Sequence, residues 1–294
     1  MTIIDDARRR DEAIAEIDWR ALPEGVDRDV VQAPSGPLAR LAAGPVDAPR
    51  MLLVPGATGS KEDFILMFPL LTAAGYRVEA YDLAGQYESA GAGPERLVPP
   101  RQRYDYRLFV DDMLSVLDHG GAPAHVLGYS FAGLVAQLAL VERPDAFSSL
   151  TLLTSPPASG QVFRGVKRIG RLSDGIEPRT GATLMLWGIR NNLNRVGPRR
   201  IAFVRERFVL TRRSSVDDII AAMMDTPDVV DAVAATPVPK LVAASTHDLW
   251  PVSQYRAYGA RIGAEVVVYE TGHSPCETAP HQLTRDLLRM IDTY

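Results

Sequence analysis

A short run around Ser130 has the residue types of a nucleophilic serine at a sharp turn. Residues 128–133 read Gly-Tyr-Ser-Phe-Ala-Gly and lie between an apolar strand-like run and an apolar, alanine-rich run. A serine at a strained strand-to-helix turn needs small residues two positions before and after it, because strand and helix approach closely there. Gly128 and Ala132 meet that requirement, with Ala132 standing where glycine is more usual. The run therefore predicts a nucleophile elbow with Ser130 at its tip.

The serine needs two partners elsewhere in the chain. Its hydroxyl is a poor nucleophile at neutral pH, so a base must remove the proton and a third group must orient that base. We predict that His273 is the base and that Asp248 orients it, since they follow the strand-like runs 265–269 and 241–245. His247 adjoins Asp248, and neighbouring side chains rarely face each other, so we expect His247 to be a loop residue.

Eight strand-like runs alternate with helical patterns along the chain. They are residues 30–32, 38–41, 51–54, 76–81, 124–128, 150–154, 241–245 and 265–269. The first two flank turn residues and predict a β-hairpin. The alternation predicts mainly parallel pairing with right-handed crossovers, and runs that are apolar on both faces predict helices on both sides of the sheet. The expected fold class is α/β, with helices over 106–119, 131–141 and 282–292.

The alternation of strands and helices divides the chain into expected domains. Residues 155–239 show helical patterns without a convincing strand and predict an inserted helical cap. The core is then formed by residues 28–154 and 240–294. Residues 1–27 are expected to be an N-terminal helical extension, because apolar residues lie among charges with amphipathic spacing over 4–20.

Five segments in order carry a resemblance to a known family. They are Leu53 to Gly59, Asp82 to Ser89, the elbow, Thr246 to Pro251, and Gly272 to Pro275. Over residues 28–294 the chain resembles the α/β-hydrolase superfamily, in particular its capped serine hydrolases such as esterases, lipases and thioesterases. The resemblance implies an eight-stranded, mainly parallel sheet covered by helices on both faces, with the chain order serine, acid, histidine.

The resemblance also implies an oxyanion hole made of two backbone N–H groups. One belongs to the residue after the nucleophile, here Phe131, and the other to the loop after the third strand, here Ala57. Thr58 is the neighbouring alternative to Ala57. Pro55 and Gly56 stand where many relatives have His-Gly, which leaves the hydrogen bonding of this loop open.

The implied activity is hydrolysis of an ester or thioester through an acyl-enzyme on Ser130. No cofactor and no metal site is expected. Two alternatives stay open: a carbon–carbon bond hydrolase of the same fold, and a ligand-binding receptor or scaffold with little turnover. Asp82 is expected to have a structural role, and Cys276 to be a small packed side chain without a strained turn.

Composition limits the other function classes. The 294 residues carry a net charge of −4, which argues against general nucleic-acid binding, and a single cysteine, which excludes an intramolecular disulfide. The charged N-terminus is unlike a signal peptide, and no stretch is long and apolar enough for a membrane span. We expect a cytoplasmic protein.

The predicted cap is basic. Residues 161–213 contain thirteen Arg or Lys and three acids, Asp174, Glu177 and Glu206. One hypothesis is that this charge attracts an anionic small-molecule substrate, an acyl carrier or an anionic lipid surface, and the other is a solvated helical face. Apolar runs at 184–187, 201–204 and 208–210 could roof a pocket above Ser130, which predicts an apolar acyl or leaving group of moderate size.

Overall fold

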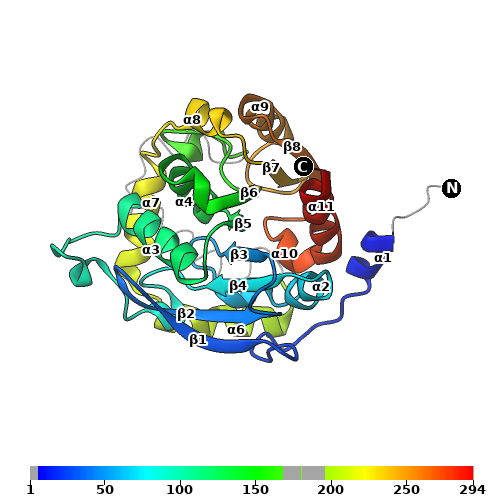
Figure 1. The fold of residues 1–294 in the computed structure, drawn as a ribbon, viewed down its shortest axis with the longest axis horizontal. Coiled ribbons are helices and arrows are strands. Elements are labelled where there is room, and N and C mark those ends of the chain that lie inside the picture. Colours follow the sequence, from blue (N-terminus) through cyan, green and yellow to red (C-terminus); the bar gives the residue numbers. More distant parts are fainter. Residues whose placement is uncertain (1–5, 168–179, 181–195, 294) are drawn as a thin grey trace.

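The computed structural model describes residues 6–167, 180 and 196–293 of the chain. One eight-stranded sheet runs through it in the order β1-β2-β4-β3-β5-β6-β7-β8 (Figure 1). The strands are β1 (Asp27–Ala33), β2 (Gly36–Ala43), β3 (Arg50–Val54), β4 (Arg77–Tyr81), β5 (Ala124–Tyr129), β6 (Phe147–Leu153), β7 (Lys240–Ser245) and β8 (Glu265–Tyr269). The expected α/β fold class and the mainly parallel eight-stranded sheet are confirmed.

The direction of the strands changes at one end of the sheet. Strands β1 and β2 form the expected hairpin, and β2 also pairs antiparallel with β4. The other five pairs are parallel. Every residue of β3 and of β7 is buried, because helices cover both faces of the sheet and leave neither face to solvent.

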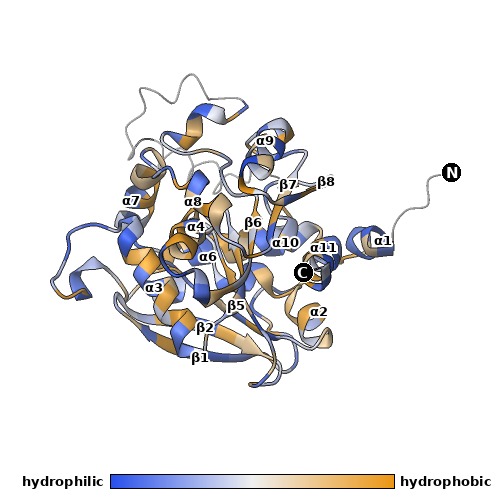
Figure 2. Cartoon of the chain, turned by 45° about the horizontal axis from the view of Figure 1, so that its top comes forward, coloured by the Kyte–Doolittle hydropathy of each residue, from blue (hydrophilic) through white to orange (hydrophobic). Residues whose placement is uncertain are grey.

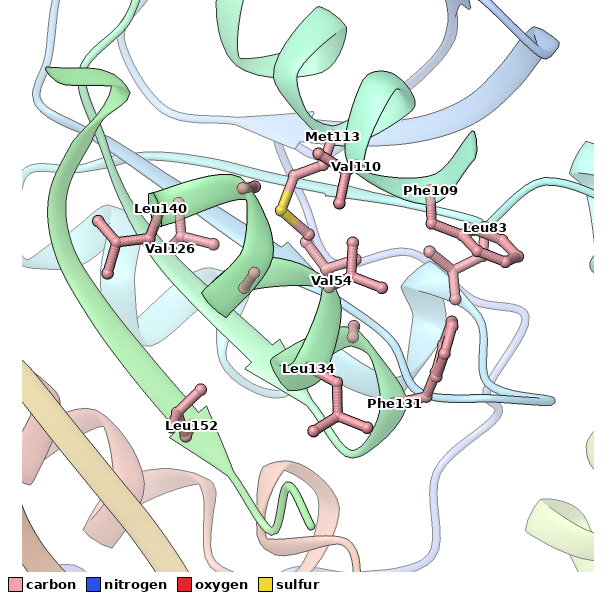
Figure 3. Close-up of a cluster of buried hydrophobic side chains, with 14 of the residues drawn as sticks. Val54, Leu83, Phe109, Val110, Met113, Val126, Phe131, Leu134, Leu140 and Leu152 are labelled. Atoms are coloured by element: carbon pink, nitrogen blue, oxygen red, sulfur yellow. The ribbon is translucent and has the colours of Figure 1, made fainter. Parts of the chain in front are cut away.

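Helices cover both faces of the sheet, and further helices pack on those helices or on one another. They are α1 (Asp6–Glu12), α2 (Phe68–Ala73), α3 (Tyr106–His119), α4 (Phe131–Glu142), α6 (Pro198–Leu210), α7 (Arg213–Met223), α8 (Val230–Ala235), α9 (Val252–Ile262), α10 (Pro275–Thr278) and α11 (Pro280–Thr293). Alternate residues of one strand enter different cores: Leu52 belongs to the core that includes residues of α3, α4, α8 and α9, whereas Leu53 belongs to the core that includes residues of α2 and α11. Hydrophobic residues gather on the strands and on the helix faces turned towards them (Figures 2 and 3).

The predicted cap contains helices α6, α7 and α8 in its described part. The β-contact described within 155–239 is a single bridge between Gly160 and Thr226. Helices α6 and α7 pack on each other through Val204, Phe208 and Ile220, but α8 packs in the same core as α4 and α9. The exact boundary of the cap at residue 239 therefore stays a prediction.

The N-terminal helix is shorter than expected. The pattern over 4–20 predicted one helix, but α1 ends at Glu12. Beyond Glu12 the pattern gains little burial, since Ala13 is exposed, and most helical stability in proteins comes from packing of an apolar face. Further along, Trp19 is buried, with the Arg200 guanidinium 4.3 Å above its ring. Asp11, near the end of α1, accepts hydrogen bonds from the backbone N–H groups of His281 and Gln282 at the start of α11. Among the described residues, no helix could cross a lipid bilayer.

Candidate active site

Ser130 occupies a strained turn between a buried strand and a buried helix. It follows the last residue of β5 and precedes the first residue of α4, with φ 53° and ψ −119°. This left-handed region is unfavourable for a residue with a Cβ atom. A Cβ on Gly128 would lie 2.7 Å from the Gly133 Cα, so strand and helix approach as closely as the sequence pattern predicts.

The structure brings the three predicted catalytic side chains together. His273 Nε2 lies 3.1 Å from Ser130 Oγ, and His273 Nδ1 lies 2.6 Å from Asp248 Oδ1. The Asp248 side chain is fully buried, whereas the His273 side chain is 26% exposed. A neutral imidazole that donates from Nδ1 to the carboxylate leaves Nε2 free to accept the serine proton. His247 is exposed and lies in the loop, as expected.

Two residues that sequence reasoning missed hold the loop of His273. Thr154 Oγ1 donates to the backbone carbonyl of His273 over 2.8 Å, and the Tyr129 hydroxyl lies 2.8 Å from Ser274 Oγ. The Tyr129 ring also lies against the imidazole, with 5.3 Å between ring centroids. The position of Tyr129 directly before Ser130 was the only local indication in the sequence that its ring would contact His273.

The Asp248 carboxylate has further partners that its sequence neighbourhood does not reveal. Oδ1 also accepts the backbone N–H of Leu249 over 2.7 Å. Oδ2 accepts the hydroxyl of Tyr255 from α9. With His273, these donors occupy both oxygens of the buried carboxylate, so its orientation is fixed.

The loop after β3 lies directly against the nucleophile. A Cβ on Gly56 would lie 2.9 Å from Ser130 Cβ and 3.1 Å from the Tyr129 carbonyl oxygen. Only glycine fits this approach. The N–H of Thr58, whose φ is 63°, donates to Gln86 Oε1 over 2.7 Å. Within the described part of the chain the Ala57 N–H has no acceptor, so of the two neighbours Ala57 is the one with an unpaired donor.

The second expected oxyanion donor belongs to Phe131, the first residue of α4. Its ring is fully buried and lies beside Phe109, with 5.2 Å between ring centroids (Figure 3). It also stacks on the Tyr106 ring, with 5.6 Å between centroids. This packing anchors the first turn of α4 and therefore the direction of its backbone N–H.

Asp82 and Cys276 lie outside the hydrogen-bonded group around Ser130. Asp82 is buried and accepts hydrogen bonds from the backbone N–H and the ammonium of Lys61, over 2.8 and 2.9 Å. Cys276 is fully buried, and burial raises the pKa of its thiol well above the ordinary value. These positions fit the structural roles expected for both residues.

Several arginines of the predicted cap are paired with acids. Arg200 and Arg207 on α6 are buried and contact Asp63, each over 2.6 Å, and Arg200 also contacts Glu277. Arg212 pairs with Glu95 and Arg213 with Asp217. Much of the described basic charge of the predicted cap is thus paired with acids of the predicted core or of the same helices. The run 184–187 and the basic residues at 168, 171, 179, 190 and 195 lie outside the described residues.

Comparison with known proteins gives the family. The model of the alpha/beta hydrolase family matches residues 51–286 of the chain. The chain belongs to this family. Among solved structures, this α/β-hydrolase resembles a hydrolase from Pseudomonas aeruginosa PA01, with 23% identity and a TM-score of 0.72 over 90% of this chain and 98% of that one.

Other similar structures have narrower descriptions. One is the enol-lactonase from Burkholderia xenovorans LB400, with 20% identity and a TM-score of 0.70 over 90% of this chain and all of that one. Another is a carboxylesterase from the ammonia-oxidizing thaumarchaeon Nitrososphaera gargenis, with 17% identity and a TM-score of 0.71 over 90% of this chain and 98% of that one. At these identities the likeness shows a shared fold.

Proposed function

We propose that this α/β-hydrolase cleaves an ester or thioester through an acyl-enzyme on Ser130. The observation that carries the proposal is the continuous hydrogen-bonded chain from Ser130 Oγ through His273 to the buried Asp248. Such a chain activates a serine hydroxyl by general-base catalysis.

In the first half of the proposed reaction, Ser130 Oγ attacks the acyl carbon and its proton passes to His273 Nε2. Asp248 holds the ring and stabilises the imidazolium. The backbone N–H groups of Phe131 and Ala57 receive the oxyanion, a contribution of about 3 kcal/mol to the barrier for each donor. His273 then protonates the leaving alcohol or thiol, and the acyl group stays on Ser130.

In the second half, water replaces the leaving group. His273 takes a proton from the water as its oxygen attacks the acyl carbon, and then returns the proton to Ser130 Oγ as the carboxylic acid leaves. No step requires a redox partner or a cofactor. The acyl or leaving group is proposed to be apolar and of moderate size, with the cap forming part of its pocket.

Turnover of p-nitrophenyl esters from acetyl to octanoyl tests the proposal. We expect hydrolysis that improves beyond acetyl, and a loss of kcat by about four to six orders of magnitude in Ser130→Ala. A preference for acetyl would contradict the apolar pocket. Cleavage of a vinylogous diketone without ester turnover would favour the carbon–carbon hydrolase, and binding without any turnover would favour a receptor.

A further inference from the structure

Asp248 receives its hydrogen bonds from three different parts of the chain. His273 Nδ1 and the Leu249 N–H meet at Oδ1, over 2.6 and 2.7 Å. Oδ2 has one described partner, the hydroxyl of Tyr255. Since the carboxylate is fully buried, water does not compete for its two oxygens. Each hydrogen-bond donor therefore has a strong effect on the charge and orientation of the Asp248 carboxylate.

Helix α9 holds the Tyr255 hydroxyl in a fixed position relative to Asp248. Helix α9 begins at Val252, four residues after Asp248, so acid and tyrosine are joined by one short segment. Trp250 in this segment is buried, and its indole N–H donates to the Val162 carbonyl over 2.9 Å. The Tyr255 side chain is itself buried. Burial and the neighbouring Asp248 raise the pKa of the Tyr255 phenol well above its ordinary value, so the phenol keeps its proton.

We propose that Tyr255 is a positioning residue that orients Asp248 and sets how tightly His273 holds a proton. The inference rests on the proposed function, which assigns His273 as the base. A donor at Oδ2 withdraws part of the carboxylate charge from the contact between Oδ1 and the imidazole. Without it, the buried oxygen has no described partner and the carboxylate attracts the imidazolium proton more strongly.

The other ionisable groups near this pair are identifiable. Tyr129 lies against the His273 ring and interacts electrostatically with Tyr255. Beyond it, Cys276, Glu277 and Asp63 act on Tyr129, and the two acids are paired with Arg200. Tyr255→Phe leaves all of these side chains in place and removes only the Tyr255 hydroxyl.

Tyr258 offers a matched control on the same helix. It lies one turn further along α9, is also buried, and donates its hydroxyl to Gln137 Oε1 rather than to Asp248. Tyr255→Phe and Tyr258→Phe therefore each delete one buried, hydrogen-bonded hydroxyl from α9. A purely structural role would give both variants the same phenotype.

The test is the pH dependence of kcat/KM and kcat on a p-nitrophenyl ester for wild type and both variants. In Tyr255→Phe we expect kcat to fall about tenfold and the acidic limb of the profile to move up by about half a pH unit, whereas Tyr258→Phe keeps the wild-type profile. A Tyr255→Phe profile that coincides with that of Tyr258→Phe overturns the inference.

An isosteric replacement covers the case in which Tyr255→Phe does not fold. Incorporation of 3-fluorotyrosine at position 255 makes the phenol a stronger donor and should move the acidic limb to lower pH. If the acidic limb of the pH profile does not move in this folded variant, the inference is wrong. The proposed function still stands in that case, provided that the wild type hydrolyses the ester. Absence of ester turnover in the wild type overturns the proposed function and this inference with it.

Discussion

At the scale of single residues, the site depends on backbone approaches that exclude side chains. Gly56 and Gly128 both lie where a Cβ would meet neighbouring atoms within 3 Å. These contacts bring the loop after β3 against Ser130 and let α4 start directly behind it. The Ala57 and Phe131 N–H groups owe their proposed position to these two glycines.

Gly56→Ala should therefore impair catalysis more than folding. The added methyl would push the loop after β3, which carries the proposed oxyanion donor Ala57, away from Ser130, and a displacement near one ångström costs about a hundredfold in rate. We expect kcat/KM for a p-nitrophenyl ester to fall by about that factor. Gly91→Ala is the control, because nothing lies within 4 Å of its added Cβ. Equal activities of the two variants would contradict this role of the loop.

How much of the site is predictable differs between residues. Ser130, His273 and Asp248 could be found because each follows a strand and their order matches the superfamily pattern. Tyr255 and Gln86 could not, because their contacts join residues that no local pattern relates. The spacing of Tyr255, Tyr258 and Ile262 is helical, so the sequence does indicate helix α9. The helices predicted from the sequence nevertheless did not include it.

At the scale of elements, the sheet was predictable and the attachments between elements were not. Buried strands such as β3 show as continuous apolar runs bounded by turn residues. By contrast, Trp19, in the segment after α1, packs beneath Arg200, some 180 residues away in the chain. A helical pattern in a short charged segment cannot report such a partner.

Helix α6 is attached to the core by buried charges. Burial opposes ionisation of Asp63, but Arg207 and Arg200 outweigh it and lower its pKa. Asp63→Asn leaves two buried guanidinium groups without this carboxylate, so we expect a loss of about 3–5 kcal/mol in the free energy of unfolding. Asp217→Asn, which breaks an exposed pair with Arg213, should cost less than about 1 kcal/mol. Urea unfolding distinguishes the two, and similar losses would refute the attachment.

Asp112 makes the packing of α3 on the hairpin dependent on pH. Its carboxylate accepts the backbone N–H and the hydroxyl of Ser35, over 3.0 and 2.6 Å, in the turn between β1 and β2. Burial raises the pKa of Asp112 to about 7. Between pH 4 and pH 7 the folded chain then keeps a proton that the unfolded chain has lost, so this group's contribution to stability falls as pH rises.

Asp112→Asn should remove this dependence, because the amide does not ionise. Relative to wild type, we expect the variant's free energy of unfolding to rise by about 2–3 kcal/mol between pH 5 and pH 8. Urea unfolding of both proteins at the two pH values measures the difference. A constant difference would show that Asp112 is already ionised at pH 5 in the folded chain.

At the scale of the whole molecule, the basic segment 161–213 contrasts with the net charge of −4. The buried pairs of Arg200 and Arg207 reduce the field that this segment presents to a substrate. If the rest of this charge is a solvated helical face with no role in binding, kcat/KM for matched anionic and neutral esters changes equally with salt concentration. A steeper decline for the anionic ester would instead support attraction of an anionic substrate, carrier or lipid by the cap.

The measurement that tests the central claim most directly is labelling by a fluorophosphonate, which forms a covalent bond with an activated serine and releases fluoride. We predict that the folded wild-type chain is labelled on the peptide containing Ser130 and that folded Ser130→Ala is not. Labelling that persists in Ser130→Ala, or a folded wild type that is not labelled, would contradict the assignment of Ser130 as the nucleophile.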